Sequence, residues 1–233
     1  YGWHYGFGLA GIGMLVGQAV YMWGQRYLKH VGNLTSGDDA SEAQKEAANR
    51  PLNAVEQDRM KVMFLSFFLV VIFWGAFEQA GGLMNIFASE YTDLTIGDFE
   101  VQATWFQSLN PAYIILLAVP VANFWIWWGR KGKEDSSLFK MATGTMVMGW
   151  GFLFMVAASM EHDAGAQSWM GWLVLAYLFH TVGELCASPV ALSFITKVAP
   201  VKYASLMMGA YFAATGFGNK LAGLMGEAAV SGM

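Results

Sequence analysis

Two glutamates lie inside long apolar stretches of this sequence. Glu78 is in the middle of KVMFLSFFLVVIFWGAFEQAGGLMNIFASEYTD, and Glu184 follows the apolar run GWLVLAYLFHTVG. If these stretches cross a membrane, each charge costs about 2.5–3.5 kcal/mol at the bilayer centre, and such residues mark substrate or proton paths. The two glutamates therefore predict proton-linked transport chemistry. The alternative is that they are polar contacts that hold membrane helices together.

The residues that follow both glutamates favour the transport interpretation. Glu78 is followed by the pair Gly81-Gly82. Glu184 is followed by Pro189. Because glycine and proline weaken a helix, the helix can bend or open at these places next to a cavity. Both glutamates are therefore expected to point inward, toward such a cavity.

Three further polar side chains in the same stretches are candidates for a polar relay: His180, Gln79 and Lys220. His180 lies one helical turn before Glu184 and on the same face, although a histidine in such a place is more often a packed polar group. Lys220 lies near the end of its apolar stretch. It either anchors the chain at the membrane surface or pairs with a carboxylate.

Asn110, Trp74 and Tyr211 are candidate contacts for a ligand. Asn110 precedes Pro111, and Pro120 interrupts the same stretch, so this amide lies near backbone groups that proline leaves unpaired. Asn110 either bonds to a neighbouring helix or contacts a ligand. Trp74 and Tyr211 either pack in the core or line a pocket for apolar groups.

No catalytic motif competes with a transport function. The sequence has no H-E-x-x-H, G-x-S-x-G or P-loop motif, and no cluster of cysteine and histidine that would hold a metal. We therefore predict no enzyme activity, no metal site and no cofactor, with protons as the coupling ion. The net charge of −4 argues against a nucleic-acid partner.

The elements that position these residues follow from the composition. Of 233 residues, 56% are hydrophobic and 13% are charged, about half the charged fraction usual in a soluble domain. Six stretches have roughly the 20 apolar residues that cross a bilayer: 5–25, 62–88, 104–128, 138–160, 168–196 and 203–226. Since a helix satisfies its own backbone in lipid, the predicted class is an all-α, polytopic membrane protein. Helices of a large soluble core are the alternative, but their apolar runs are shorter.

Basic residues alternate between the connections of these six spans. Twelve of the 13 lysines and arginines lie in or beside three connections: Arg26, Lys29, Lys45, Arg50, Arg59 and Lys61; Arg130, Lys131, Lys133 and Lys140; Lys197 and Lys202. The opposite connections, EYTDLTIGDFEVQ and EHDAGAQ, have none. The positive-inside rule places the basic side, with residues 30–60, in the cytoplasm. The predicted location is therefore the lipid bilayer of the cell membrane.

Five motifs resemble helices of one transporter family. FWGAFEQAGGLMNIFASEYTD is similar to the seventh-helix signature of the proton-dependent oligopeptide transporter (POT/PTR) family. QSLNPAYIILLAVP is similar to its eighth helix, and GELCASPVALSFITKVAP to its tenth. MMGAYFAATGFGNKLAG resembles its eleventh helix, and GWHYGFGLAGIGMLVGQAVY its sixth. The resemblance is collinear over nearly the whole chain.

This resemblance implies a fold and a domain organisation. Members have the major-facilitator fold, in which two six-helix bundles enclose a central cavity. Residues 1–29 would be the last helix of the N-terminal bundle, and 30–60 a cytoplasmic linker. Residues 61–233 would be five helices of the C-terminal bundle, without the twelfth. The chain is accordingly expected to be a piece of a longer protein, with the N-terminal bundle as its partner.

The resemblance also implies roles for individual residues. Glu78 would bind the coupling proton, and Glu184 would bind the amino terminus of a peptide. Asn110 would hydrogen-bond to the peptide backbone. Three more residues would line the substrate cavity: Ser188, Trp74 and Tyr211. The family often has tryptophan at the position of Tyr211.

The function predicted on this basis is a proton-coupled symporter that imports di- and tripeptides by alternating access. Its partners would be the peptide, protons and the lipid bilayer. One alternative is a carrier of the same fold for nitrate or another small substrate. The other is a membrane receptor or assembly subunit that transports nothing. A nitrate carrier has no need of a carboxylate that binds an amine, so Glu184 favours the peptide.

Overall fold

The computed structural model describes residues 3–27 and 50–231, and the chain divides into two units, Tyr1–Pro51 and Leu52–Met233. The first unit contains the 22-residue helix α1, Trp3–Gly24, and a short 3-10 helix η1, Gln25–Tyr27. At 1.5 Å per residue α1 is about 33 Å long, enough to cross a bilayer.

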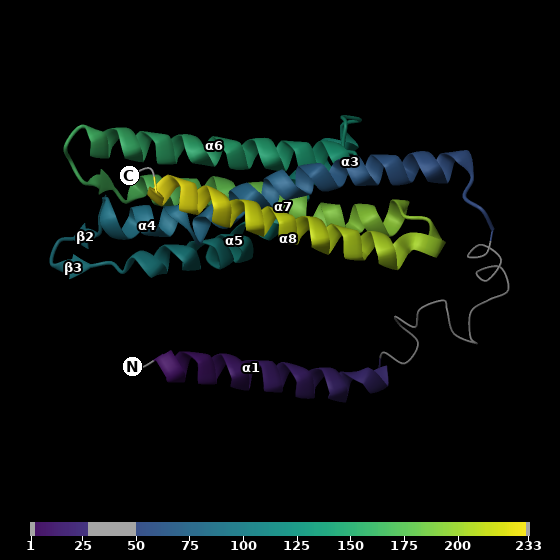
Figure 1. Cartoon of the computed structure of the whole chain (residues 1–233), viewed down its shortest axis with the longest axis horizontal. Helices are drawn as coiled ribbons and strands as arrows, with labels where there is room; N and C mark the ends of the chain where they lie inside the picture. Colours follow the sequence, from purple (N-terminus) through teal and green to yellow (C-terminus); the bar gives the residue numbers. More distant parts are fainter. Residues whose placement is uncertain (1–2, 28–49, 232–233) are drawn as a thin grey trace. The chain divides into compact units, whose positions relative to one another are not determined.

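The second unit is a bundle of long helices (Figure 1). In chain order its helices are α3 (Ala54–Phe77), η2 (Glu78–Ala80), α4 (Leu83–Glu90), η3 (Ala103–Ser108), α5 (Leu109–Arg130), α6 (Ser137–Asp163), α7 (Gly171–Val198), η4 (Val201–Tyr203) and α8 (Ala204–Ser231). The most extensive packing is between α6 and α7, followed by that of α3 on α8 and of α5 on α7. Helix α7 therefore lies between α5 and α6.

Within residues 3–27 and 50–231, five helices are long and apolar enough to cross a membrane, which confirms the predicted helical class and most of the predicted spans. They are His4–Tyr27, Ala54–Glu90, Ala103–Arg130, Ser137–Asp163 and Gly171–Val198. The sixth predicted span, 203–226, corresponds to α8. This helix has 28 residues but is not among the five. It is rich in glycine and alanine, and it carries Asn219, Lys220 and Glu227, which lower its hydropathy.

The bundle begins earlier than predicted. Helix α3 starts at Ala54 because Asn53 forms a capping box with Glu56: the Asn53 side chain accepts from the Glu56 backbone N–H at 2.8 Å, and the Glu56 carboxylate accepts from the Asn53 N–H at 2.9 Å. Residues 54–60 of the predicted linker are therefore helical. The linker residues 30–49 lie outside the described residues.

The predicted span 62–88 is broken at the glycine pair. Helix α3 ends at Phe77, and the 3-10 turn η2 follows it. The Gly81 and Gly82 N–H groups bond to Glu78 and Gln79, both at 3.2 Å, in short i→i−3 steps. Gly82, with φ −101° and ψ −105°, is then the N-cap residue of α4. The expected opening of the helix beside Glu78 is confirmed.

The prolines behave differently. Pro189 lies inside α7, which runs without a break from Gly171 to Val198, so the opening expected beside Glu184 is absent. Pro120 likewise lies inside α5, and Pro111 lies in the first turn of that helix, where the missing N–H would have no helical partner. The predicted interruption of this span is therefore wrong.

Helices α6 and α7 approach each other at two facing glycines. A Cβ atom at Gly144 would lie 2.6 Å from the Gly183 carbonyl oxygen, and one at Gly183 would lie 2.6 Å from that of Gly144. Small residues allow such close backbone contact between membrane helices. The contact fixes the position of α7, the helix that carries Glu184.

Short strands tie the helix ends together at one end of the bundle. Strand β1 (Thr92–Asp93) pairs in parallel with β4 (Ser168–Trp169), and the Ser168 N–H bonds to the Tyr91 carbonyl at 2.9 Å. The end of α4 is thereby joined to the α6–α7 connection. The neighbouring strands β2 (Thr95–Ile96) and β3 (Phe99–Glu100) form a hairpin.

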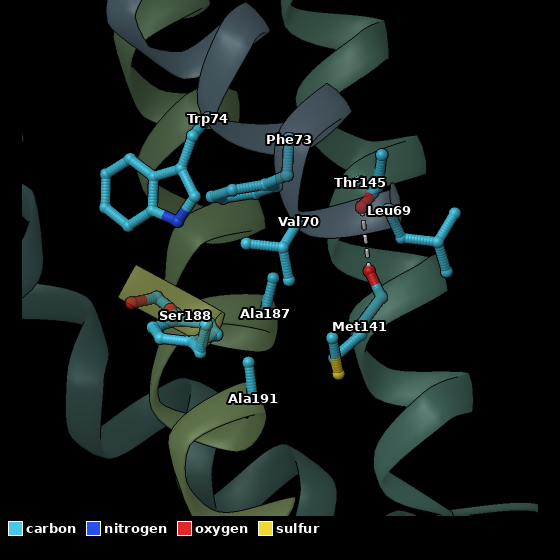
Figure 2. Close-up of a pocket in the computed structure, with 10 residues that line it drawn as sticks. Leu69, Val70, Phe73, Trp74, Met141, Thr145, Ala187, Ser188 and Ala191 are labelled. Carbon is cyan, nitrogen blue, oxygen red and sulfur yellow. Dashed lines mark hydrogen bonds between the residues drawn. The ribbon is translucent and has the colours of Figure 1, made fainter. Parts of the chain in front are cut away.

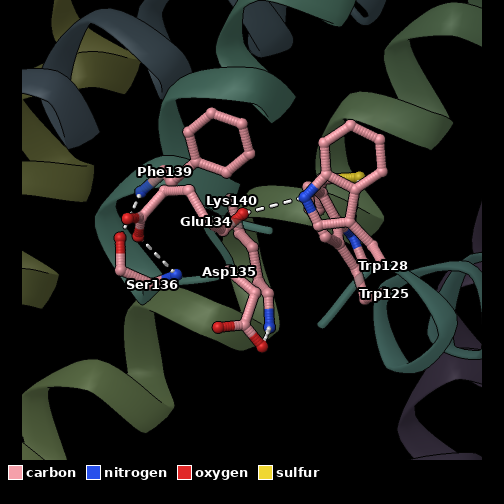
Figure 3. A network of polar contacts seen from close by, with 8 residues as sticks. Trp125, Trp128, Glu134, Asp135, Ser136, Phe139 and Lys140 are labelled. Carbon is pink, nitrogen blue, oxygen red and sulfur yellow. Dashed lines mark hydrogen bonds and ion pairs between the residues drawn. The ribbon is translucent and has the colours of Figure 1, made fainter. Parts of the chain in front are cut away.

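The α5–α6 connection at the other end is held by its own side chains. Figure 3 shows the Trp128 indole N–H, which donates to the Glu134 carbonyl at 2.9 Å. The Glu134 carboxylate accepts from the Ser136 N–H at 3.0 Å, and Lys140 pairs with Asp135 at 3.9 Å. These contacts hold the short connection between α5 and α6 in a defined conformation.

Candidate functional site

Glu184 and Asn110 are brought together between α7 and α5. The Asn110 amide nitrogen donates to the Glu184 carboxylate at 2.8 Å and to the Thr181 hydroxyl at 3.2 Å. Both Glu184 and Asn110 are half-buried. Of the two interpretations of Asn110, the structure shows the bond to a neighbouring helix; contact with a ligand stays a prediction.

Trp74, Ser188 and Tyr211 meet at a second place, a small cavity between α3, α6, α7 and α8. The residues that line it are Leu69, Val70, Phe73, Trp74, Met141, Thr145, Ala187, Ser188, Ala191 and Tyr211 (Figure 2). Its volume is about 10 Å³, close to the space that one water molecule occupies. The three predicted pocket residues are thus neighbours, around a space with room for about one water molecule.

Helical spacing relates the residues of the small cavity to the two glutamates. Ser188 follows Glu184 by one helical turn on α7, and Trp74 precedes Glu78 by the same spacing. Spacing alone would therefore place both glutamates next to the small cavity, but neither of them lines it.

Glu78 faces α8. It is half-buried and lines a cavity of about 500 Å³. The lining residues are Glu78, Gln79, Gly82, Ile86, Asn219, Ala222, Gly223, Gly226 and Glu227. Glu184 is not among them, because its side chain turns toward α5 instead. Within this unit Glu184 therefore does not line the cavity that Glu78 borders.

The Gln79 side chain hydrogen-bonds to the backbone of two helices. This side chain is buried, and its amide nitrogen donates to the Gly75 carbonyl at 3.1 Å and to the Ala222 carbonyl of α8 at 3.2 Å. These bonds hold the end of α3 against α8. They give Gln79 a structural task, and its relay role stays a prediction.

His180 packs against α6 rather than toward Glu184. It is 1% exposed, its ring centroid lies 4.5 Å from that of Phe152, and Gly151 leaves room for the imidazole. Neither ring nitrogen has a hydrogen-bond partner among the described residues. This geometry favours the packed interpretation of His180 over a relay.

Lys220 is exposed on α8. No carboxylate of the described residues is ion-paired with it. Since the aliphatic stem of lysine can lie along apolar surface while its ammonium group reaches water, this position favours the anchoring interpretation.

Sequence reasoning missed Tyr177 and Thr181. The Tyr177 hydroxyl donates to the Ala80 carbonyl at 2.9 Å, and the Thr181 hydroxyl donates to the Tyr177 carbonyl at 2.8 Å. Both residues lie on the face of α7 that carries Glu184, at offsets of seven and three residues before it. In the sequence, their spacing before Glu184 on one face of a helix is the signal that indicates them.

Known proteins resemble this chain along most of its length. The model of the POT family (PTR2) matches residues 40–232. The peptide transporter YePEPT of Yersinia enterocolitica is 31% identical over 97% of this chain and 55% of its own length. The dipeptide and tripeptide permease A of Proteus mirabilis is 32% identical over 75% of this chain and 36% of its own length.

Solved structures agree with these relatives. The crystal structure of a peptide transporter POT in complex with sulfate superposes with a TM-score of 0.69 at 25% identity, and the match covers 97% of this chain and 48% of that one. A mutant of peptide transporter POT in complex with alafosfalin gives 0.67 at 28% identity over 79% and 38%. The chain thus spans from about a third to about half of the length of its relatives. With the motifs, the helical bundle and these matches in agreement, the chain belongs to the POT family of multi-pass membrane proteins.

Proposed function

We propose that this chain is part of a proton-coupled symporter that imports di- and tripeptides by alternating access. The observation that carries the proposal is the state of Glu184. Its carboxylate is half-buried in an apolar bundle and bonds to the neutral amide of Asn110. Among the described residues, no lysine, arginine or histidine forms an ion pair with it. A partly desolvated carboxylate without a cation is a site for a cationic group of a ligand.

A peptide supplies this cation through its amino terminus. Its carboxylate would bind basic groups of an N-terminal bundle, to which residues 1–29 would contribute the last helix. The Asn110 amide, which already orients Glu184, would also bond to the peptide backbone. The names of the relatives support this substrate class, since they are peptide transporters and permeases rather than enzymes. An anion such as nitrate would be repelled by Glu184.

Glu78 would be the proton switch. It lies at the break between α3 and α4 and lines the cavity next to α8, so water can reach its carboxyl group. Protonation would neutralise Glu78 and release an ion pair with the N-terminal bundle. The cavity would then change sides as the two bundles rock. Residues 30–60 would connect the bundles on the cytoplasmic side of the cell membrane.

The test is uptake of radiolabelled dialanine by proteoliposomes that contain the full-length protein. We expect accumulation when the outside is acidic, and none when a protonophore removes the gradient. Binding of dialanine without accumulation would instead support a receptor. Accumulation that ignores the pH gradient would rule out proton coupling.

A further inference from the structure

The break in the α3–α4 span leaves a carbonyl group that an uninterrupted helix would use. Ala80 is the last residue of η2, and the last carbonyl groups of a helix have no partner within it. The Tyr177 hydroxyl fills this role for Ala80, at 2.9 Å and from 97 residues further along the chain. Tyr177 is 2% exposed, so its hydroxyl has little access to other partners.

Two neighbouring residues of the break are held by different helices. Gln79 bonds to Ala222 of α8, and Ala80 accepts from Tyr177 of α7. A displacement of α7 relative to α8 must therefore change the backbone geometry beside Glu78, or break one of these bonds.

The same face of α7 leads from Tyr177 to the proposed substrate carboxylate. Tyr177, Thr181 and Glu184 are spaced i, i+4 and i+7 on an unbroken helix. Asn110 bonds to both Thr181 and Glu184, and the Thr181 hydroxyl donates to the Tyr177 carbonyl. If a ligand bound to Glu184 displaced α7, the Tyr177 side chain would move with this helix.

We propose that Tyr177 is a positioning residue that links Glu184 to the helix break beside Glu78. This inference rests on the proposed function. The Tyr177 hydroxyl stabilises the broken form of the span, because in a straight helix the Ala80 carbonyl would accept from the Met84 N–H instead. Tyr177 therefore sets how readily the break opens and closes during the transport cycle, without touching the peptide.

The matched pair of variants is Tyr177→Phe and Tyr113→Phe in the full-length protein. Tyr113 is the control because its hydroxyl also bonds from a helix to the backbone of α7, at Val174 and 3.4 Å, but does not reach the break. In proteoliposomes we expect Tyr177→Phe to lower the maximum rate of acid-driven dialanine uptake about fivefold with the KM within about twofold, the size of effect of one hydrogen bond. Tyr113→Phe should leave both values within about twofold.

A double variant tests whether Tyr177 is coupled to the Glu184 site or acts only at the helix break. Residues of one network have non-additive effects. Asn110→Ala combined with Tyr177→Phe should therefore lose less rate than the product of the two single losses. Multiplicative losses would overturn the link. The link would also be overturned if Tyr177→Phe left the maximum rate unchanged or changed only the KM. It would be overturned as well if Tyr113→Phe lowered the maximum rate equally.

A distance measurement tests Tyr177 independently of transport. Spin labels at the exposed positions 65 on α3 and 89 on α4, with native cysteines including Cys186 replaced by alanine, report the angle of the break. We expect Tyr177→Phe to broaden or shift this distance distribution and Tyr113→Phe to preserve it. A distribution unchanged by Tyr177→Phe rejects the role of Tyr177, whereas absent acid-driven uptake by the wild type rejects the proposed function.

Discussion

At the residue scale, the chemistry of this chain depends on what surrounds each carboxyl group. Glu184 bonds to a single neutral amide, that of Asn110, whereas Glu78 borders a cavity that it shares with Glu227. The same residue type thus has two different surroundings: one carboxylate bonds to an amide of α5, and the other borders a cavity next to α8.

Replacement of Glu184 by alanine should weaken binding of peptides that have a free amino terminus. The lost interaction is a hydrogen bond to a charged group, worth about 1.5–3 kcal/mol, so the Kd of dialanine should rise at least about tenfold. Calorimetric titration of the full-length protein measures this change. N-acetylated dialanine is the control ligand, because it has no ammonium group and its weak binding should not change. Equal affinity of wild type and variant for dialanine would contradict the assigned role.

Replacement of Glu78 by glutamine should abolish proton-driven uptake and leave peptide exchange measurable. Glutamine keeps the size of the side chain but cannot change its charge, so the switch would be locked in its neutral form. Proteoliposome uptake with a pH gradient, compared with counterflow without one, separates the two activities. Glu227→Gln is the matched control, since it removes a carboxylate from the same cavity and should retain driven uptake. Driven uptake that survives Glu78→Gln would show that the switch lies elsewhere.

At the scale of elements, glycine decides both where a helix breaks and where two helices touch. The pair Gly81-Gly82 ends one helix and starts another, while Gly144 and Gly183 let α6 and α7 approach to backbone contact. Proline had the smaller effect, because α7 continues through Pro189. Helix-weakening residues follow both Glu78 and Glu184, yet the helix is broken only beside Glu78.

Gly183→Ala should destabilise the α6–α7 contact. Its new Cβ would meet the Gly144 carbonyl oxygen at 2.6 Å and the Met148 Cβ at 2.9 Å, so the backbones must separate at a cost of about 1–3 kcal/mol. A lower melting temperature in detergent would report this cost. Gly149→Ala is the control on α6, where nothing lies within 4 Å of the new atom. Equal melting temperatures of the two variants would show that the contact is not tight.

The turn after β1 should lose order in acid. Asp93 accepts hydrogen bonds from the Thr95 side chain and from its N–H, and these bonds hold the pKa of Asp93 below its usual value. Because the folded pKa is lowered, the stabilisation is complete above the unfolded pKa of about 3.9 and is lost as pH falls through the folded value. Protection of the Thr95 amide from hydrogen exchange, corrected for the intrinsic rate, should fall in that range. Asp93→Asn should show a flat profile.

At the scale of the whole molecule, alternation of charge between the connections predicts the orientation. With the α5–α6 connection inside and the β2–β3 hairpin outside, a cysteine at position 133 should react with a membrane-impermeant maleimide only after cells are permeabilised. A cysteine at position 98 should react in intact cells. Both native residues are exposed, so burial does not confuse the comparison. The opposite pattern would invert the topology.

Much of this organisation was predictable because it depends on residues that are near one another in sequence. Length and hydropathy predicted the helical class and the five spans that the structure confirms, and the motifs around Glu78 and Glu184 predicted the family. Boundaries were less accurate: the capping box at Asn53 moved the start of α3, and α8 proved less apolar than its length suggested.

The partners of the site residues came only from the tertiary structure. Asn110 hydrogen-bonds to Glu184, 74 residues away in sequence, and the Ala80 carbonyl accepts from Tyr177, 97 residues away. His180 turns toward α6 although helical periodicity places it near Glu184, because Gly151 makes room for its ring. Periodicity along one helix determines which residues share a face. Which neighbour that face meets depends on how closely the other helices approach, and that distance is set by side chains far away in the sequence.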